Sequence, residues 1–164
     1  LSVGVSNAYR ALTETRQAYQ QARSAIRSGE MASATIDDGG YFLYADYAFM
    51  HMLALTGRRT NLLGLCHPAL LDLLEYDEVH GGELMETLHC YLQVAGSTSR
   101  ASAMLNLHKN TMLYRLGRIR EVLGMNLSSG EQLFQLQISF RILMNLGLFT
   151  PRLRLNRTEL IDEK

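Results

Sequence analysis

The sequence predicts a mainly α-helical protein, in which a helical C-terminal part follows the partial remnant of a small α+β domain. Apolar residues recur at steps of three and four through most of residues 84–146, which is the spacing of helices with a buried face. Short runs rich in β-forming residues occur within the first 45 residues. The chain has 164 residues, of which 47% are hydrophobic, so it can bury the core of one or two small domains.

The first 45 residues alternate strand and helix signals. In order these are a strand in SVGVS (2–6), a helix over 8–27 that Ser28 and Gly29 end, and two β-leaning pieces at 34–36 and 41–44 around an Asp-Asp-Gly-Gly turn. This order predicts the C-terminal part of an α+β domain. Because the opening strand has no partner before it, we expect the residues that complete this domain to precede Leu1.

Residues 46–80 are predicted to form a helical connector. Asp46 is suited to cap a helix over 47–55, because its carboxylate can accept hydrogen bonds from free amide groups of the first turn. Pro68 fits the first position of a following helix that has a leucine-rich face. Two glycines then separate this helix from the next one.

Residue spacing predicts no cofactor and no metal ion. Cys66 and Cys90 are far from a CxxC spacing, which indicates two buried, reduced thiols. His51 and His67 lack a cysteine or acidic partner at ligand spacing, so both are expected to have structural roles. No apolar run approaches the roughly 20 residues that span a bilayer. We therefore expect a cytoplasmic protein without a membrane segment.

Residues 81–124 have the layout of a helix-turn-helix. In order they contain a predicted helix that starts at Leu84 and ends near Gly96, capping hydroxyls at 97–99, a second helix that ends near Leu105, and a third helix over 109–123. Asn106 lies where such a turn often requires a left-handed backbone, which asparagine tolerates best after glycine. His108 then lies at the cap of the third helix.

The third helix separates an apolar face from a polar one. Its inward face is predicted from four residues at steps of four, three and four: Met112, Leu116, Ile119 and Leu123. Its outer face comprises Asn110, Tyr114, Gly117 and Glu121, flanked by Arg115 and Arg118 on one side and by Lys109, Leu113 and Arg120 on the other. An amide and a phenol bordered by cations suit the major groove of DNA, where asparagine can bond adenine twice.

The last part of the chain predicts one long helix and a basic tail. The residues expected to face inward are Leu133, Leu136, Phe140, Leu143 and Leu146. Phe134, Ile138 and Ile142 widen this stripe, which leaves open a contact with a second subunit or a wide core contact within one chain. The basic tail at 149–164 alternates arginine with leucine and is expected to be weakly ordered.

The run LNLHKNTMLYRLGRIREVLG resembles the signature HRNTLRYRLxRIExLLG of the C-terminal helix-turn-helix in PucR/CdaR-type bacterial transcription regulators. The matching residues are His108, Asn110, Thr111, Tyr114, Arg115, Leu116, Arg118, Ile119, Leu123 and Gly124, with Lys109 in place of the usual arginine. The upstream stretch LLDLLEYDEVHGGELMETLHCYL is also similar to this family. Residues 3–36 resemble, more weakly, the end of its degenerate GGDEF-like domain.

The resemblance implies a sequence-specific regulator that binds double-stranded DNA as a homodimer through residues 81–148. It also implies a GGDEF-like fragment at 1–45 and a small-molecule inducer sensed by a region missing from this chain. The implied DNA contacts are His108, Lys109, Asn110, Thr111, Leu113, Tyr114, Arg115, Arg118 and Arg100. Leu113 stands where the family often carries arginine, so the phosphate or base contact expected of that arginine is lost. Met104 and Asn106 also depart from the family pattern, which changes the expected turn geometry.

The residues leave one other class of function open and disfavour a second. A helix-turn-helix can act as a protein-interaction module that packs on a partner protein and binds no DNA, and the salt dependence of binding to mixed duplex DNA separates this alternative from DNA binding. An enzyme is disfavoured, because the sequence has no paired carboxylates, no activated nucleophile and no phosphate-binding glycine loop in the required context.

Overall fold

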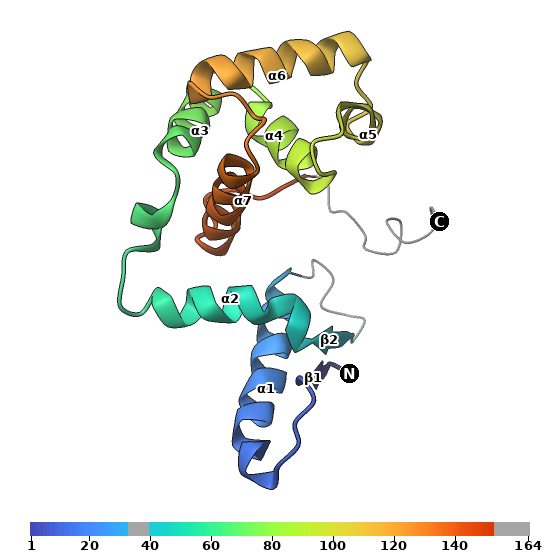
Figure 1. The fold of residues 1–164 in the computed structure, drawn as a ribbon, viewed down its shortest axis with the longest axis vertical. Coiled ribbons are helices and arrows are strands. Elements are labelled where there is room, and N and C mark those ends of the chain that lie inside the picture. Colours follow the sequence, from blue (N-terminus) through green and yellow to red (C-terminus); the bar gives the residue numbers. More distant parts are fainter. Residues whose placement is uncertain (33–39, 153–164) are drawn as a thin grey trace. The chain divides into compact units, whose positions relative to one another are not determined.

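The computed structural model of the chain describes residues 1–32 and 40–152 (Figure 1). It is mainly helical, as predicted, and it divides into two compact units with a boundary between Leu62 and Leu63. The first unit contains all the strands of the described ranges, and the second contains the predicted helix-turn-helix. Each unit has its own buried core.

The first unit is a small α+β arrangement. Strand β1 (Val3–Val5) pairs in parallel with β2 (Tyr41–Leu43), with Val3 opposite Tyr41. Parallel neighbours require a crossover connection, and helix α1 (Thr15–Ala32) lies between the two strands in the chain. A short 3₁₀ turn, η1 (Leu12–Glu14), precedes α1. Helix α2 (Tyr44–Thr56) follows β2 directly and packs on α1.

The predicted bounds of the first helix, 8–27, were wrong at both ends. Helix α1 begins only at Thr15, directly after η1. Leu12 lies in η1 and is exposed, so this side chain makes no buried contact that would extend the helix toward residue 8. It continues through Gly29, because this glycine serves packing and does not end the helix. A Cβ atom on Gly29 would clash with Cδ1 of Phe42, so only glycine lets α1 approach β2 this closely. The predicted strand at 34–36 lies outside the described residues.

Asp46 is not the cap of the second helix. Helix α2 begins at Tyr44, and Asp46 lies in its first turn. Leu43 occupies the cap position without a side-chain hydrogen bond, because β2 runs straight into α2. The stretch 46–80, predicted as a connector, is therefore divided: α2 belongs to the first unit, and the next helix belongs to the second.

The second unit is a bundle of short helices around α4. Its elements in order are η2 (Leu62–Leu65, which spans the boundary between the units), α3 (Pro68–His80), α4 (Leu84–Gln93), α5 (Thr98–Met104), α6 (Lys109–Leu123) and α7 (Gly130–Asn145). Helix α6 packs on α3, α4 and α5, and α7 packs on α4 (Figure 1). Helix α4 was expected to bury one stripe, yet every residue from 84 to 92 is buried. Neighbouring helices on several sides explain the difference.

The helix ends of the second unit follow the predicted local signals. Pro68 is the first residue of α3, and His67 caps this helix by accepting a hydrogen bond at Nδ1 from the Ala69 amide, at 3.3 Å. Helix α6 ends at Gly124, which has a left-handed backbone with φ of 62°. Ser129 caps α7. Among the helices of the described ranges, none combines the length and the apolarity needed to cross a membrane.

Part of the wide apolar stripe of α7 is buried within the chain, and part of it is exposed. Leu136, Phe140 and Leu143 are buried as predicted, and Ile142 is buried with them, so this part of the stripe is a core contact within one chain. Phe134, by contrast, exposes 56% of its surface. Leu146 was expected to face inward, and this expectation was wrong, because Leu146 follows the last residue of α7 and is exposed. The outer part of the stripe therefore remains uncovered in the single chain.

Candidate nucleic-acid interface

Helices α5 and α6 are joined by the tight turn that the sequence predicted. Asn106 has a left-handed backbone with φ of 51°, as expected for this position. The turn is closed by a hydrogen bond of 2.8 Å from the Leu107 amide to the Ser102 carbonyl. His108 caps α6, because its Nδ1 accepts a hydrogen bond of 3.3 Å from the Asn110 amide. Backbone conformation and cap together fix the direction in which α6 leaves the turn.

The left-handed backbone of Asn106 makes a prediction about stability. Glycine adopts this conformation freely, whereas a residue with a Cβ and no local polar compensation is strained by about 1–2 kcal/mol. Asn106→Gly should therefore unfold close to the wild-type urea midpoint, and Asn106→Ala should unfold at a lower urea concentration. Urea denaturation followed by circular dichroism measures both. Equal stability of the two variants would contradict this view of the turn.

The inner face of α6 is buried as predicted. Met112, Leu116, Ile119 and Leu123 all lie in the core of the second unit. Helix α6 covers α3, α4 and α5 with this face. The helix is therefore held as a rigid part of the domain, and its opposite face is left for solvent or a ligand.

The outer face of α6 carries polar and apolar side chains that are exposed to solvent. The exposed residues at its start are His108, Lys109, Asn110, Thr111, Leu113 and Tyr114. Tyr114 exposes 74% of its surface and Leu113 exposes 47%. A Cβ built on Gly117 meets no atom within 4 Å, so this glycine is not required by packing within the chain. It leaves the backbone of the outer face open to close approach by another molecule.

Two arginines that were predicted to contact DNA form ion pairs and hydrogen bonds with other side chains of the same chain. The Arg115 guanidinium forms an ion pair of 3.0 Å with Glu83 and donates to the Thr87 hydroxyl at 3.2 Å. Arg118 pairs with Glu121 at 2.6 Å and donates to the Tyr76 hydroxyl at 3.1 Å. These contacts connect α6 to the start of α4 and to the end of α3.

The ion pairs change the protonation equilibria of their members. The Arg115 guanidinium holds the pKa of the Glu83 carboxyl below its ordinary value, and Arg152 adds to this effect. Hydrogen bonds to Glu121 and Tyr76 raise the pKa of Arg118 further. The sequence offered one signal for these contacts, since Glu121 follows Arg118 by three residues on the same helix. It offered none for Glu83, which lies 32 residues before Arg115.

The other predicted cations differ in their surroundings. Arg100 is exposed, but its guanidinium donates to the Val94 carbonyl at 2.9 Å, at the end of α4. Lys109 is exposed at the start of α6, and Arg120 is exposed near its end. No ion pair within residues 1–32 and 40–152 includes either of these two side chains. Their charges are therefore available to an anionic partner.

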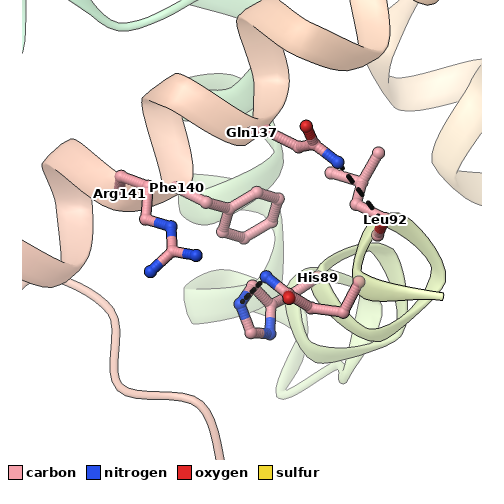
Figure 2. A pocket seen from close by; sticks show the side chains of 6 residues that line it. His89, Leu92, Gln137, Phe140 and Arg141 are labelled. Atoms are coloured by element: carbon pink, nitrogen blue, oxygen red, sulfur yellow. Dashed lines mark hydrogen bonds between the residues drawn. The ribbon is translucent and has the colours of Figure 1, made fainter. Parts of the chain in front are cut away.

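A shallow hollow on the second unit lies between α4 and α7 and is lined by His89, Gln93, Phe140 and Arg141 among others (Figure 2). The His89 ring is buried, with its centroid 5.2 Å from that of Phe140. Gln137 donates across the gap to the Leu92 carbonyl at 3.3 Å. Burial lowers the pKa of His89, because the charged imidazolium would lose its water. These contacts join α7 to α4, so we assign them a structural role.

The chain is similar to known proteins over this region. Residues 84–142 match the family model of the PucR C-terminal helix-turn-helix domain. The DNA-binding transcriptional activator AdeR of Bacillus subtilis (strain 168) is 23% identical over 142 residues, which are 87% of this chain and 33% of AdeR. The purine catabolism regulatory protein of the same organism is 26% identical over 87% of this chain and 26% of its own length.

A third relative has the same range of similarity. The proline-responsive transcriptional activator PutR of Bacillus subtilis (strain 168) is 26% identical over 86% of this chain and 34% of its own length. This chain thus spans about a third or less of the curated relatives it matches. No solved structure matches it significantly.

The family match covers α4, α5, α6 and most of α7, which are the elements that build and support the turn at Asn106. The relatives are named as transcriptional activators or regulators, in agreement with this geometry. Residues 84–142 of this chain are therefore a PucR-type C-terminal helix-turn-helix domain.

Proposed function

We propose that this chain is the DNA-binding part of a sequence-specific transcriptional regulator, and that α6 is its recognition helix in the major groove of double-stranded DNA. The observation that carries this proposal is the outer face of α6, where Asn110, Thr111 and Tyr114 are exposed on a helix whose other face is buried. A rigid helix with uncovered polar side chains near its N-terminus is what groove recognition requires. The family match and the names of the relatives support the same function.

Each exposed residue at the start of α6 has a chemical role in this proposal. Asn110 would bond one adenine through both its amide oxygen and its amide nitrogen. Lys109 would bond a guanine or a phosphate. Thr111 and Tyr114 offer hydroxyls to bases or phosphates, and Leu113 offers an apolar surface to a thymine methyl group. His108 lies beside them at the cap.

The arginines have a second kind of role. Arg118 keeps 42% of its side chain exposed while bound to Glu121, so its free N–H groups can reach a phosphate. Arg100 is also exposed and can do the same. Arg115 has only 22% of its side chain exposed and contributes chiefly by the contacts that hold α6. In this view the protein contacts orient the guanidinium groups before DNA binds.

The base-reading role of Asn110 gives the test of this function. A duplex pool of random sequence is first passed over the wild-type chain to select the bound sequences. Asn110→Ala should then weaken binding to a selected duplex by about 1–3 kcal/mol and leave binding to the random pool nearly unchanged, because only base contacts carry sequence information. Fluorescence anisotropy titrations at fixed salt concentration measure both affinities.

Asn126→Ala is the matched control, since Asn126 is an exposed asparagine in the loop after α6. It should leave both affinities unchanged. If Asn110→Ala reduced specific and random binding equally, Asn110 would not read bases. If the wild-type chain bound no duplex at any salt concentration, the alternative of a protein-interaction module would replace DNA binding.

Finer properties belong to the same proposal. We propose that the regulator acts as a homodimer and that the exposed Phe134 on α7 lies in the subunit contact, where a second subunit would remove its ring from water. We also propose that residues 1–45 are the end of a GGDEF-like domain, which the parallel β1 and β2 with α1 between them support. The protein would act in the cytoplasm.

An inducer forms the last part of the proposal. One relative is named as proline-responsive, which suggests that related regulators respond to small molecules. We propose that a small-molecule inducer is sensed in a region equivalent to the part of the relatives that this chain does not cover. The described residues are assigned no inducer site.

A further inference from the structure

The carboxylate of Glu83 is shared by two arginines from different parts of the second unit. Glu83 precedes α4 by one residue and keeps 45% of its side chain exposed. One of its oxygens, Oε2, lies 3.0 Å from the Arg115 guanidinium in the middle of α6. The other, Oε1, lies 2.7 Å from the guanidinium of Arg152 beyond the end of α7. A single side chain thus connects the recognition helix to the segment that follows α7.

A second contact fixes Arg115 on the same turn of α4. The Thr87 hydroxyl donates to the Glu83 carbonyl at 2.7 Å and accepts from Arg115 at 3.2 Å. Thr87 is fully buried, so its hydroxyl has little freedom to turn elsewhere. Arg115 is therefore held at two points, one charged and one neutral, and such a pair restricts both its position and its rotation.

The segment that carries Arg152 is itself attached to α4. The Arg152 amide donates to the Glu86 carboxylate at 3.1 Å. Three residues earlier, the Phe149 ring lies 5.5 Å from that of His89 and 5.2 Å from that of Phe140. A hydrogen bond to a carboxylate and an aromatic contact thus fix residues 149–152 along α4. The backbone of Arg152 is therefore held beside α4, and its side chain, which is 74% exposed, reaches the Glu83 carboxylate from there.

We propose that Glu83 is a positioning residue for DNA recognition: it holds Arg115 and thereby sets the placement of the outer face of α6. This inference rests on the proposed function and assigns Glu83, Thr87 and Arg152 to it, none of which is on the recognition helix. A carboxylate near DNA repels phosphate, so Glu83 cannot add to affinity by its own charge. Its value lies in orienting the helix, because bidentate base contacts tolerate little displacement.

The alternative is that Arg115 is a phosphate ligand for which Glu83 merely competes. Glu83→Gln removes the charge and keeps the shape of the side chain. The two views predict opposite changes in the affinity of this variant for the selected duplex. If Glu83 competes with phosphate, its neutralisation frees Arg115 and strengthens binding to all duplex DNA. If Glu83 positions α6, its neutralisation weakens binding to the selected duplex while binding to random duplex stays the same or rises slightly.

The experiment compares Glu83→Gln with Glu131→Gln in the full chain. Glu131 lies on α7, where its carboxylate accepts a hydrogen bond from Gln135, so this variant removes the same charge without touching α6. Binding to a selected duplex and to random duplex is titrated at several salt concentrations. Glu83→Gln is expected to lose about tenfold in affinity for the selected duplex relative to Glu131→Gln, as for one charge-assisted hydrogen bond. Glu83→Asp should restore part of the loss.

Stronger binding of Glu83→Gln to both duplexes would overturn the proposal, and so would unchanged binding or an equal loss on both. Hydrogen exchange of the free proteins gives a readout that needs no DNA: amides of α6 should exchange faster in Glu83→Gln than in Glu131→Gln, with the core of α7 unaffected. Unchanged exchange would also overturn it. Failure of the wild-type chain to bind any duplex would instead reject the proposed function, and hydrogen exchange would then show by itself whether Glu83 holds α6 through Arg115.

Discussion

Replacing Leu116 by alanine is expected to lower the free energy of unfolding of the second unit by about 2–5 kcal/mol. Leu116 is 1% exposed on the inner face of α6, where the helix rests on its neighbours. The substitution removes buried methyl and methylene groups and leaves a cavity that rigid helix contacts cannot fill. Because domains of this size are stable by about 5–15 kcal/mol, the loss is a large part of the total.

Urea denaturation, with hydrogen exchange of α6 peptides as the local probe, measures this effect. Leu113→Ala is the matched control: it makes the same chemical change on the same helix, at a residue that is 47% exposed. We expect Leu113→Ala to lose less than about 1 kcal/mol of stability, as surface substitutions do. Its DNA affinity should nevertheless fall, since Leu113 is on the proposed groove-facing side. Equal destabilisation by both substitutions would reject the assignment of the two faces.

The contrast between these two leucines explains why the core of the site was predictable from sequence. The inward stripe of α6 is a local property, because helical spacing alone determines which residues share a face. The turn was equally local: Asn106 tolerates a left-handed backbone, and His108 can cap the helix that follows two residues later. Each of these features depends on a few neighbouring residues, and the structure confirms them.

The arginine contacts were not predictable in this way. Arg115 lies on the predicted flank of α6, but its carboxylate partner Glu83 comes from before α4 and is positioned only when the helices pack. The same holds for Tyr76, whose hydroxyl accepts a hydrogen bond from Arg118, 42 residues later in the chain. Sequence periodicity gives the direction of a side chain but not the identity of what it meets in another element.

The two wrong predictions for helix ends in the first unit have a related cause. Gly29 carries the usual signal for a helix end, yet its role is set by Phe42 of β2, which fills the space a side chain would need. Asp46 carries the usual signal for a cap, yet β2 continues into α2 two residues earlier. In both cases a contact made by tertiary structure decided between two uses of the same residue.

Replacing Phe140 by alanine should cost about 3–5 kcal/mol of stability, as expected for the loss of a buried aromatic side chain. Phe140 is 2% exposed on α7, and its ring contacts both His89 of α4 and Phe149 of the C-terminal segment. The substitution therefore loosens the attachment of α7 and of residues 149–152 together. Urea denaturation at neutral pH, followed by circular dichroism, measures the loss.

The same substitution should change how stability depends on pH. Burial lowers the pKa of His89 in the folded protein, so the unfolded chain binds a proton more readily as the pH falls. The stabilisation from the buried neutral ring is thus present above the unfolded pKa of about 6.5 and is lost below it. In Phe140→Ala water reaches His89, and the fall in unfolding free energy between pH 7 and pH 5 should be smaller than in the wild type.

Leu136→Ala separates the two effects of the Phe140 substitution. Leu136 is fully buried on the same helix, but the ring contacts of His89 in the described ranges are with Phe140 and Phe149. We expect Leu136→Ala to cost about 2–5 kcal/mol while it keeps the wild-type pH dependence. If both variants kept that dependence, the buried imidazole would not be its source, and the acidic groups near α4 would have to account for it.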